Sequence, residues 1–156
     1  MSFQITALAA EPFDEFFAMS DQALADHLAV RLVATAKPGF PCRVSLADAE
    51  VGEELILVNH QHQAGASPYR ATHAVYVRKD ARQARPAVDA LPEQLTSRTL
   101  SLRAFDSQAM IVTADLVEGR DLGAALERLL ADPNAAYVHI HFAKYGCYAA
   151  RADRAL

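Results

Sequence analysis

The segment Lys37-Pro38-Gly39-Phe40-Pro41 constrains the fold most strongly, because two prolines and a glycine interrupt both helices and strands. Before this break the pattern is mixed. Residues 3–8 favour a short strand, a helical pattern follows, and the β-branched content of residues 30–33 favours another strand. After the break, short apolar and β-branched runs dominate. The break therefore separates a mixed N-terminal part from a strand-rich remainder.

The runs after the break predict several strands. The strongest signal is Glu-Leu-Ile-Leu-Val-Asn-His at residues 54–60, which is apolar and short enough for a buried strand. Residues 99–105 and 109–117 predict a hairpin around Asp106-Ser107-Gln108. Further strands are expected at residues 43–46, 72–78, 137–143 and 147–152.

Helical periodicity lies between these groups of strands. Ser20 is a plausible N-cap for a helix in which Leu24 and Leu28 stack, and Pro92 suits the first turn of a short helix that runs to about residue 98. Residues 121–131 carry leucines on one helical face. Helices that are segregated between groups of strands favour an α+β fold, with a largely antiparallel sheet and a few short helices packed on one side or end. We expect one domain over residues 1–156.

Composition limits the classes of partner. The formal net charge is −4, and no stretch concentrates lysine and arginine, which argues against nucleic acid as a partner. No apolar run exceeds four residues, so we expect no membrane span. No targeting segment is recognisable at the start, and two cysteines do not make a disulfide framework. We therefore expect a cytoplasmic protein with reduced thiols.

Two His-x-His pairs are the first candidates for chemistry: His60 with His62, and His139 with His141. Residues i and i+2 of a strand project to the same face, so each pair presents two imidazoles together. Two such pairs from neighbouring strands suffice for a zinc or iron site. The acidic ligand that would follow the first pair is missing, because residues 63–66 are Gln-Ala-Gly-Ala. We therefore favour exposed histidines at strand ends, without a metal.

Cys42 and Cys147 are candidate nucleophiles. Cys42 precedes Arg43, and Cys147 lies four residues before Arg151, and a nearby guanidinium favours the reactive thiolate form. A pair of Cys42 with His141 would resemble the thiol and base of a covalent catalyst. The alternative is that both thiols are small buried hydrophobic groups.

Arg43, Arg70 and Arg103 each lie on or beside an expected strand, and Tyr69 precedes Arg70. The planar guanidinium suits carboxylate or phosphate recognition, so three converging arginines would form an anion pocket. The alternative is structural pairing of these arginines with Asp48, Asp106 or Asp115. Nucleotide-binding glycine loops, a Gly-x-Ser-x-Gly elbow and a His-Glu-x-x-His helix are all missing.

Several of these residues stand in motifs that resemble an uncharacterised bacterial family, DUF1203. Residues 37–53, Lys-Pro-Gly-Phe-Pro-Cys-Arg-Val-Ser-Leu-Ala-Asp-Ala-Glu-Val-Gly-Glu, carry the most specific part of the resemblance. The other motifs are Ser-Pro-Tyr-Arg at 67–70, Ser-Leu-Arg-Ala-Phe-Asp at 101–106, Val-His-Ile-His at 138–141 and Gly-Cys at 146–147. The resemblance implies a small cytoplasmic bacterial domain and no particular activity. Members often carry Gly-Pro-Ile-Phe-Val near residues 72–77, so it implies no role for His73.

Two functional hypotheses follow. In the first, a polar pocket binds or acts on a small anionic molecule. Cys42, His141 and Cys147 would do proton or nucleophilic work there, and Arg43, Tyr69, Arg70, Arg103 and His139 would hold the ligand. In the second, the protein is a non-catalytic interaction module without an active site. The sequence identifies no cofactor, and it does not separate an enzyme from a binding protein.

Overall fold

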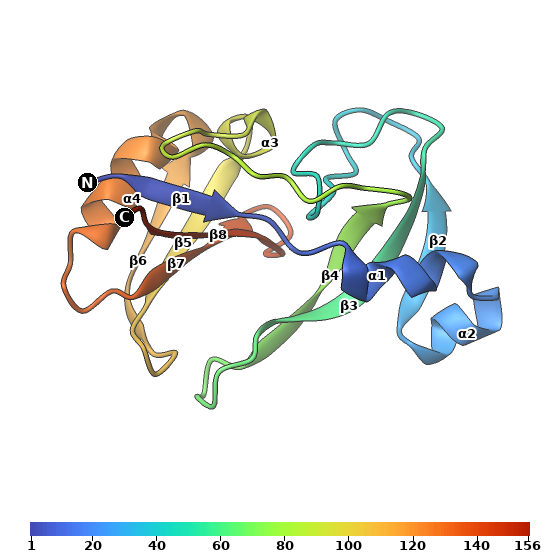
Figure 1. Ribbon diagram of the computed structural model, residues 1–156, viewed down its shortest axis with the longest axis horizontal. Coiled ribbons are helices and arrows are strands. Elements are labelled where there is room, and N and C mark those ends of the chain that lie inside the picture. The colour runs from blue at the N-terminus through green and yellow to red at the C-terminus, as the bar shows by residue number, and fades with distance from the viewer.

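The computed structural model describes residues 1–156 and contains eight strands in two separate antiparallel sheets (Figure 1). One sheet has five strands in the order β1-β8-β7-β5-β6, and the other has three in the order β2-β3-β4. The strands are β1 (Phe3–Thr6), β2 (Ala29–Val33), β3 (Glu54–Gln63), β4 (Ala71–Arg78), β5 (Thr99–Phe105), β6 (Ile111–Glu118), β7 (Tyr137–Phe142) and β8 (Tyr148–Arg154). The helices are α1 (Glu11–Asp14), α2 (Asp21–Asp26), α3 (Glu93–Thr96) and α4 (Leu122–Leu130), with 3-10 turns at Glu15–Ala18 and Gly119–Asp121.

The predicted α+β class with antiparallel strands and short helices is confirmed, but the strand expected at residues 43–46 is wrong. Pro41 and Asp48 form an isolated bridge, and the Cys42 N–H donates to the carbonyl of Ala47 at 3.2 Å. The intervening residues make a turn in which Leu46 has φ of 52°. A reversal this tight leaves no extended segment for a sheet to pair with.

The larger core lies between the five-stranded sheet and α4. The leucines expected on one face of this helix are buried in it, with Leu126 and Leu130 fully inaccessible. On β7 the alternate residues Val138 and Ile140 belong to the same core. Because side chains of a strand alternate between faces, Tyr137, His139 and His141 lie on the opposite face of this sheet. That second face carries the buried histidines of β7.

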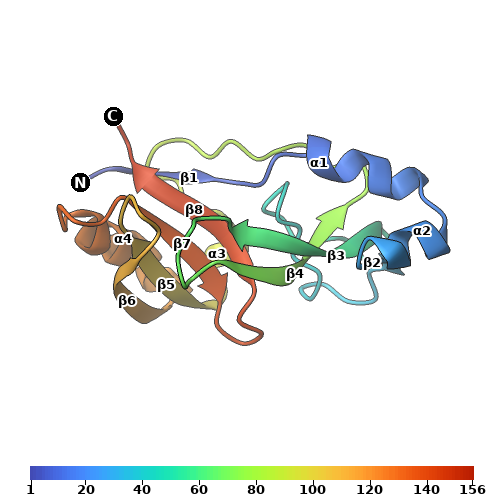
Figure 2. The same cartoon turned by 90° about the horizontal axis from the view of Figure 1, so that it is seen from below.

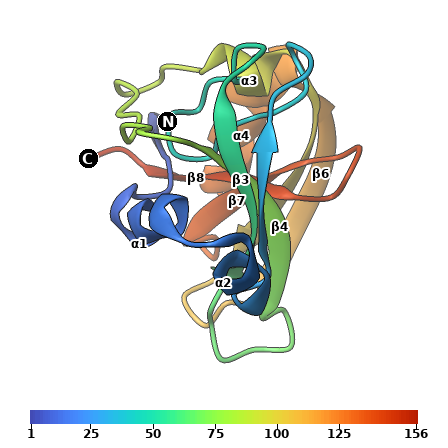
Figure 3. The same ribbon diagram turned by 90° about the vertical axis from the view of Figure 1, so that its right-hand side faces the viewer.

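The smaller core lies between the three-stranded sheet and the N-terminal helices α1 and α2 (Figure 3). Ser20 is the N-cap of α2, as predicted, and its hydroxyl accepts a hydrogen bond from the Ala23 N–H at 3.1 Å. The helix ends before Leu28, whose φ of 55° is left-handed and stops the helical path. Helices therefore cover both sheets, rather than one side or end of a single sheet.

The two sheets meet where the last residues of β3 lie over β7 and β8 (Figure 2). The strand expected at residues 54–60 continues to Gln63, whose side-chain amide donates to the Tyr137 hydroxyl at 3.0 Å. The β3–β4 connection also contacts the β5–β6 turn, because the Ser67 hydroxyl donates to the Ala109 carbonyl at 2.7 Å. A Cβ on Gly65 would lie 2.3 Å from that of Ala109, so only glycine permits this approach. No helix is long and apolar enough to cross a bilayer.

Candidate metal centre

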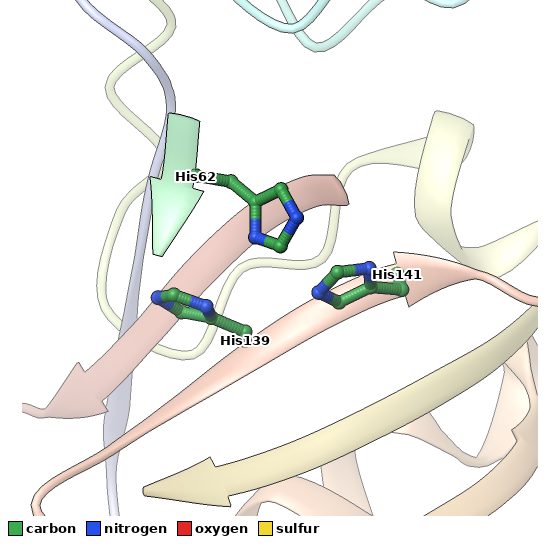
Figure 4. Close-up of side chains that lie close together, drawn as sticks. All are labelled: His62, His139 and His141. Atoms are coloured by element: carbon green, nitrogen blue, oxygen red, sulfur yellow. The ribbon is translucent and has the colours of Figure 1, made fainter. Parts of the chain in front are cut away.

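Three histidines converge between the two sheets (Figure 4). His139 and His141 come from β7, and His62 comes from the end of β3. Their potential ligand nitrogens all lie within 4.8 Å of one another. The ring of His62 lies 5.0 Å from that of His141 and 6.3 Å from that of His139, between centroids. β7 thus supplies two imidazoles, because residues 139 and 141 project to the same face of the strand, and β3 supplies the third.

The hydrogen bonds of His141 define its tautomer. Its Nδ1 lies 3.0 Å from the carbonyl oxygen of Gly146. A carbonyl only accepts, so Nδ1 carries the proton and Nε2 carries a free lone pair. Metal-binding histidines in proteins are commonly oriented in this way by a carbonyl on the second nitrogen.

Three nitrogens of the cluster are buried and have no hydrogen-bond partner in the protein. They are His62 Nδ1, His139 Nδ1 and His141 Nε2. Two of the three histidines are almost inaccessible, at 4% exposed for His139 and 1% for His141. The expectation of exposed strand-end histidines is therefore wrong for this pair, because β3 covers the polar face of β7.

Burial keeps the cluster neutral. Desolvation is the main cause that lowers the pKa of His62 to about 4 and those of His139 and His141 to about 3. The positive charge of Arg103 lowers all three further. A neutral imidazole is the form that binds a metal.

Tyr148 of β8 packs against all three rings. It stacks on His62 with centroids 5.5 Å apart and an interplanar angle of 8°, and it meets His139 and His141 edge-on. Burial raises the pKa of its phenol. This ring therefore fixes the positions of the imidazoles and stays a neutral phenol.

Two arginines flank His139 on the same face. In the sheet register, His139 pairs with Arg103 of β5 and with Arg151 of β8. Arg151 forms a two-pronged ion pair with Asp153, at 2.7 and 2.8 Å, and its guanidinium lies 4.1 Å from the centre of the Tyr137 ring. Arg103 makes neither a side-chain hydrogen bond nor an ion pair within the protein, and burial lowers its pKa. A cation without a counter-charge thus stands beside the cluster.

One side of the cluster opens to a groove of about 700 Å³. His62, His139 and Arg151 line one wall of this groove. The β3–β4 connection and the β5–β6 turn form its other walls. A small molecule in the groove would contact His62 and His139 directly.

The other sequence-derived candidates do not join this cluster. Arg43 and Cys147 line a separate pocket. Cys42 is buried in the smaller core, where its sulfur accepts hydrogen bonds from the backbone N–H groups of Ser45 and Arg78 and makes none with His141.

Arg70 and Tyr69 serve the β3–β4 connection. The guanidinium of Arg70 donates to the carbonyl oxygens of Gly65 and Ala64, and the Tyr69 ring meets Phe105 edge-on at 6.2 Å. The three arginines of the expected anion pocket therefore have three different surroundings. None of them pairs with a carboxylate, and Asp48 and Asp115 pair instead with Arg98 and Arg128.

Sequence reasoning named His62 only as half of a His-x-His pair, and it missed Tyr148. His62 had a usable signal in that spacing, although its neighbour His60 turns toward Phe13, with ring centroids 5.8 Å apart. No local sequence pattern marks Tyr148. Its contacts with the histidines arise only when β3, β7 and β8 come together in the fold.

The comparison with family models gives one result. The model of the family described as "Protein of unknown function (DUF1203)" matches residues 39–154. Neither the curated proteins nor the solved structures contain a match.

Proposed function

The chain belongs to the DUF1203 family, and we propose that its three histidines bind one divalent transition-metal ion, beside which a small anionic molecule is held. The ligands would be His62, His139 and His141. Arg103 would face the anion. His139, His141 and Arg103 are also candidates on sequence grounds, and a small anion is the ligand that the sequence suggests.

One observation carries the proposal: three buried imidazole nitrogens without partners lie together. Leaving one buried polar atom unsatisfied costs about 1–3 kcal/mol. Three such atoms in one place would be a large cost for a domain whose total stability is of the order of 5–15 kcal/mol. A metal ion satisfies all three lone pairs at once.

The donor set selects the kind of metal. Neutral imidazoles suit zinc, copper, nickel and iron, whereas magnesium and calcium require oxygen ligands. Zinc–nitrogen bonds of about 2.0–2.1 Å in a tetrahedron place the nitrogens roughly 3.3 Å apart. The cluster is wider than this, with separations of up to 4.8 Å, so small side-chain rotations would draw the rings together on binding.

Charge balance supports an anion as a further ligand. Three neutral imidazoles leave the full +2 charge of the ion uncompensated, and Arg103 adds another positive charge nearby. Three protein ligands with one open position are also the pattern of catalytic zinc sites, in which a bound water or substrate completes the tetrahedron. Such an ion lowers the pKa of its water or polarises a substrate oxygen. We therefore propose metal-assisted binding or hydrolysis of a small anionic substrate.

The first experiment is elemental analysis of the untagged, purified protein, followed by titration of the chelator-treated protein with zinc, cobalt and nickel. We expect one ion per chain, and we expect His139→Ala and His141→Ala to abolish stoichiometric binding. His27→Ala is the matched control, because His27 is exposed and lies outside the cluster. Equal binding by the wild type and the His139→Ala/His141→Ala double variant would overturn the proposal. The interaction module would then become the leading hypothesis.

A further inference from the structure

A second cavity of about 570 Å³ lies apart from the three histidines, none of which lines it. Its walls come from the proline break and Arg43, from β3 and β4, from residues 98–99 at the start of β5, and from the end of β7 with the turn that follows it. No aspartate or glutamate is among its lining residues, whereas Arg43, Arg98 and Lys144 are. The cavity is therefore lined by positive charge only.

Arg43 is the most unusual of these cations, because it is only 1% exposed and has no carboxylate partner. Its Nε donates to the Tyr148 carbonyl oxygen at 2.7 Å, and one terminal nitrogen donates to the Pro41 carbonyl. Its guanidinium also lies 4.9 Å from the centre of the Phe142 ring. Carbonyl dipoles and an aromatic face orient the group, but they do not neutralise its charge. A buried charge without a counter-ion is costly.

Arg98 and Lys144 add to this excess. Arg98 lies 5.0 Å from the centre of the same Phe142 ring and forms an ion pair of 2.7 Å with Asp48. Lys144 lines the cavity, is exposed and forms no ion pair. Of the three cations only Arg98 has a carboxylate partner, Asp48, which does not itself line the cavity.

Part of the remaining lining is apolar. Pro38, Pro41, Leu57 and Phe142 present hydrocarbon surface to the cavity. A cavity of this size that combines a few convergent polar groups with an apolar wall is typical of small-molecule sites.

We propose that this cavity binds a small organic anion, with a carboxylate or phosphate group facing Arg43, Arg98 and Lys144 and an apolar body against the prolines and Phe142. The site is independent of the metal centre. The bound anion would supply the counter-charge that Arg43 lacks within the protein. Its ligands would all carry one carboxylate or phosphate group attached to an apolar body.

The test uses the full-length, metal-free protein, so that binding cannot run through a metal ion. Benzoate and phenyl phosphate are titrated by calorimetry and by chemical-shift perturbation, with benzamide as the uncharged probe of similar shape. We expect saturable binding of at least one anion, with shifts at Lys144 and Cys147, and no binding of benzamide. Absence of saturable anion binding at millimolar concentration, or equal binding of benzamide, would overturn the proposal.

A matched pair of charge reversals tests the location. Lys144→Glu and Arg82→Glu change the net charge equally at exposed positions, and only Lys144 lines the cavity. We expect Lys144→Glu to weaken anion binding about tenfold, and Arg82→Glu to change it less than about twofold. Equal effects of the two reversals would place the anion elsewhere and sink the proposal. Neither result depends on whether the histidines bind metal.

Discussion

The Nδ1 of His141 lies 3.0 Å from the carbonyl oxygen of Gly146, and this contact turns the Nε2 lone pair of His141 toward His62 and His139. The carbonyl belongs to the tight turn between β7 and β8, in which Gly146 has φ of 78°. A left-handed conformation of this kind favours glycine. The turn therefore orients a side chain of the strand that precedes it.

His139→Leu should separate the stability of the metal-free protein from metal binding. His139 makes no hydrogen bond through its buried Nδ1, so an apolar side chain of similar volume removes an unsatisfied atom. We expect the free energy of unfolding in chelator to rise by about 1 kcal/mol. Zinc at a hundredfold excess over its dissociation constant should stabilise the wild type by about 2.7 kcal/mol and leave the variant unaffected. Urea denaturation with and without zinc measures both, and a variant that zinc still stabilises would contradict the assignment.

Arg103→Met should strengthen binding of the metal ion in the absence of added anions. The guanidinium repels a second cation beside it, so its removal favours the bound state by several-fold. In contrast, the gain in zinc affinity that acetate or phosphate gives the wild type should shrink in this variant. Competition titrations with a chromophoric chelator measure both effects. Arg128→Met, which removes an exposed arginine from an ion pair with Asp115, serves as the control and should change neither.

Tyr148→Phe and Tyr148→Ala should differ sharply. The ring of Tyr148 stacks on His62, and phenylalanine retains that contact, so Tyr148→Phe should bind zinc as the wild type does. Tyr148→Ala leaves a cavity at a site that is 5% exposed, and it should cost about 3–5 kcal/mol of stability and loosen the imidazoles. Thermal denaturation and zinc titration distinguish the pair. A tenfold loss of zinc affinity in Tyr148→Phe would instead assign a direct role to the hydroxyl.

The stability of the fold should include an acid-sensitive contribution from Glu53. Its carboxylate accepts two hydrogen bonds from Arg78, both of 2.8 Å, and this contact holds the pKa of Glu53 below its ordinary value of 4.5. A lowered folded-state pKa means that the contribution is fully present above pH 4.5 and is lost as the pH falls through the folded value. Wild type should therefore exceed Glu53→Gln in stability at neutral pH, by less than about 1 kcal/mol. Denaturant titrations from neutral to acidic pH should show the two curves converging, and a constant gap would exclude this ion pair as the cause.

Local sequence patterns predicted the elements well where the pattern itself sets the structure. The leucine face of α4, the Ser20 cap and the alternation of β7 all follow from spacing, and each is present. The turn at Arg43 was missed because its β-branched neighbour suggested a strand, whereas the pairing of Pro41 with Asp48 reverses the chain.

The site was harder to predict because it depends on contacts between distant segments. His139 and His141 were identified from their spacing, but their burial depends on the β3–β4 hairpin, which crosses from the other sheet. No local sequence pattern predicts that a distant hairpin will cover the polar face of a strand. The same limit left open whether Arg43, Arg70 and Arg103 converge on one pocket, because their places in the fold depend on the assembled topology.

Only His62 reaches the cluster from the three-stranded sheet, and the other two histidines belong to the five-stranded sheet. An ion held by all three histidines would cross-link the two sheets. Its affinity would then depend on how the two sheets are oriented relative to each other. A partner that binds one orientation of the two sheets preferentially would therefore change the affinity for the metal. By thermodynamic linkage, the metal would change the affinity for that partner by the same factor. Metal release and movement of the sheets would then be a single equilibrium. It could be followed either through metal affinity or through the relative orientation of the two sheets.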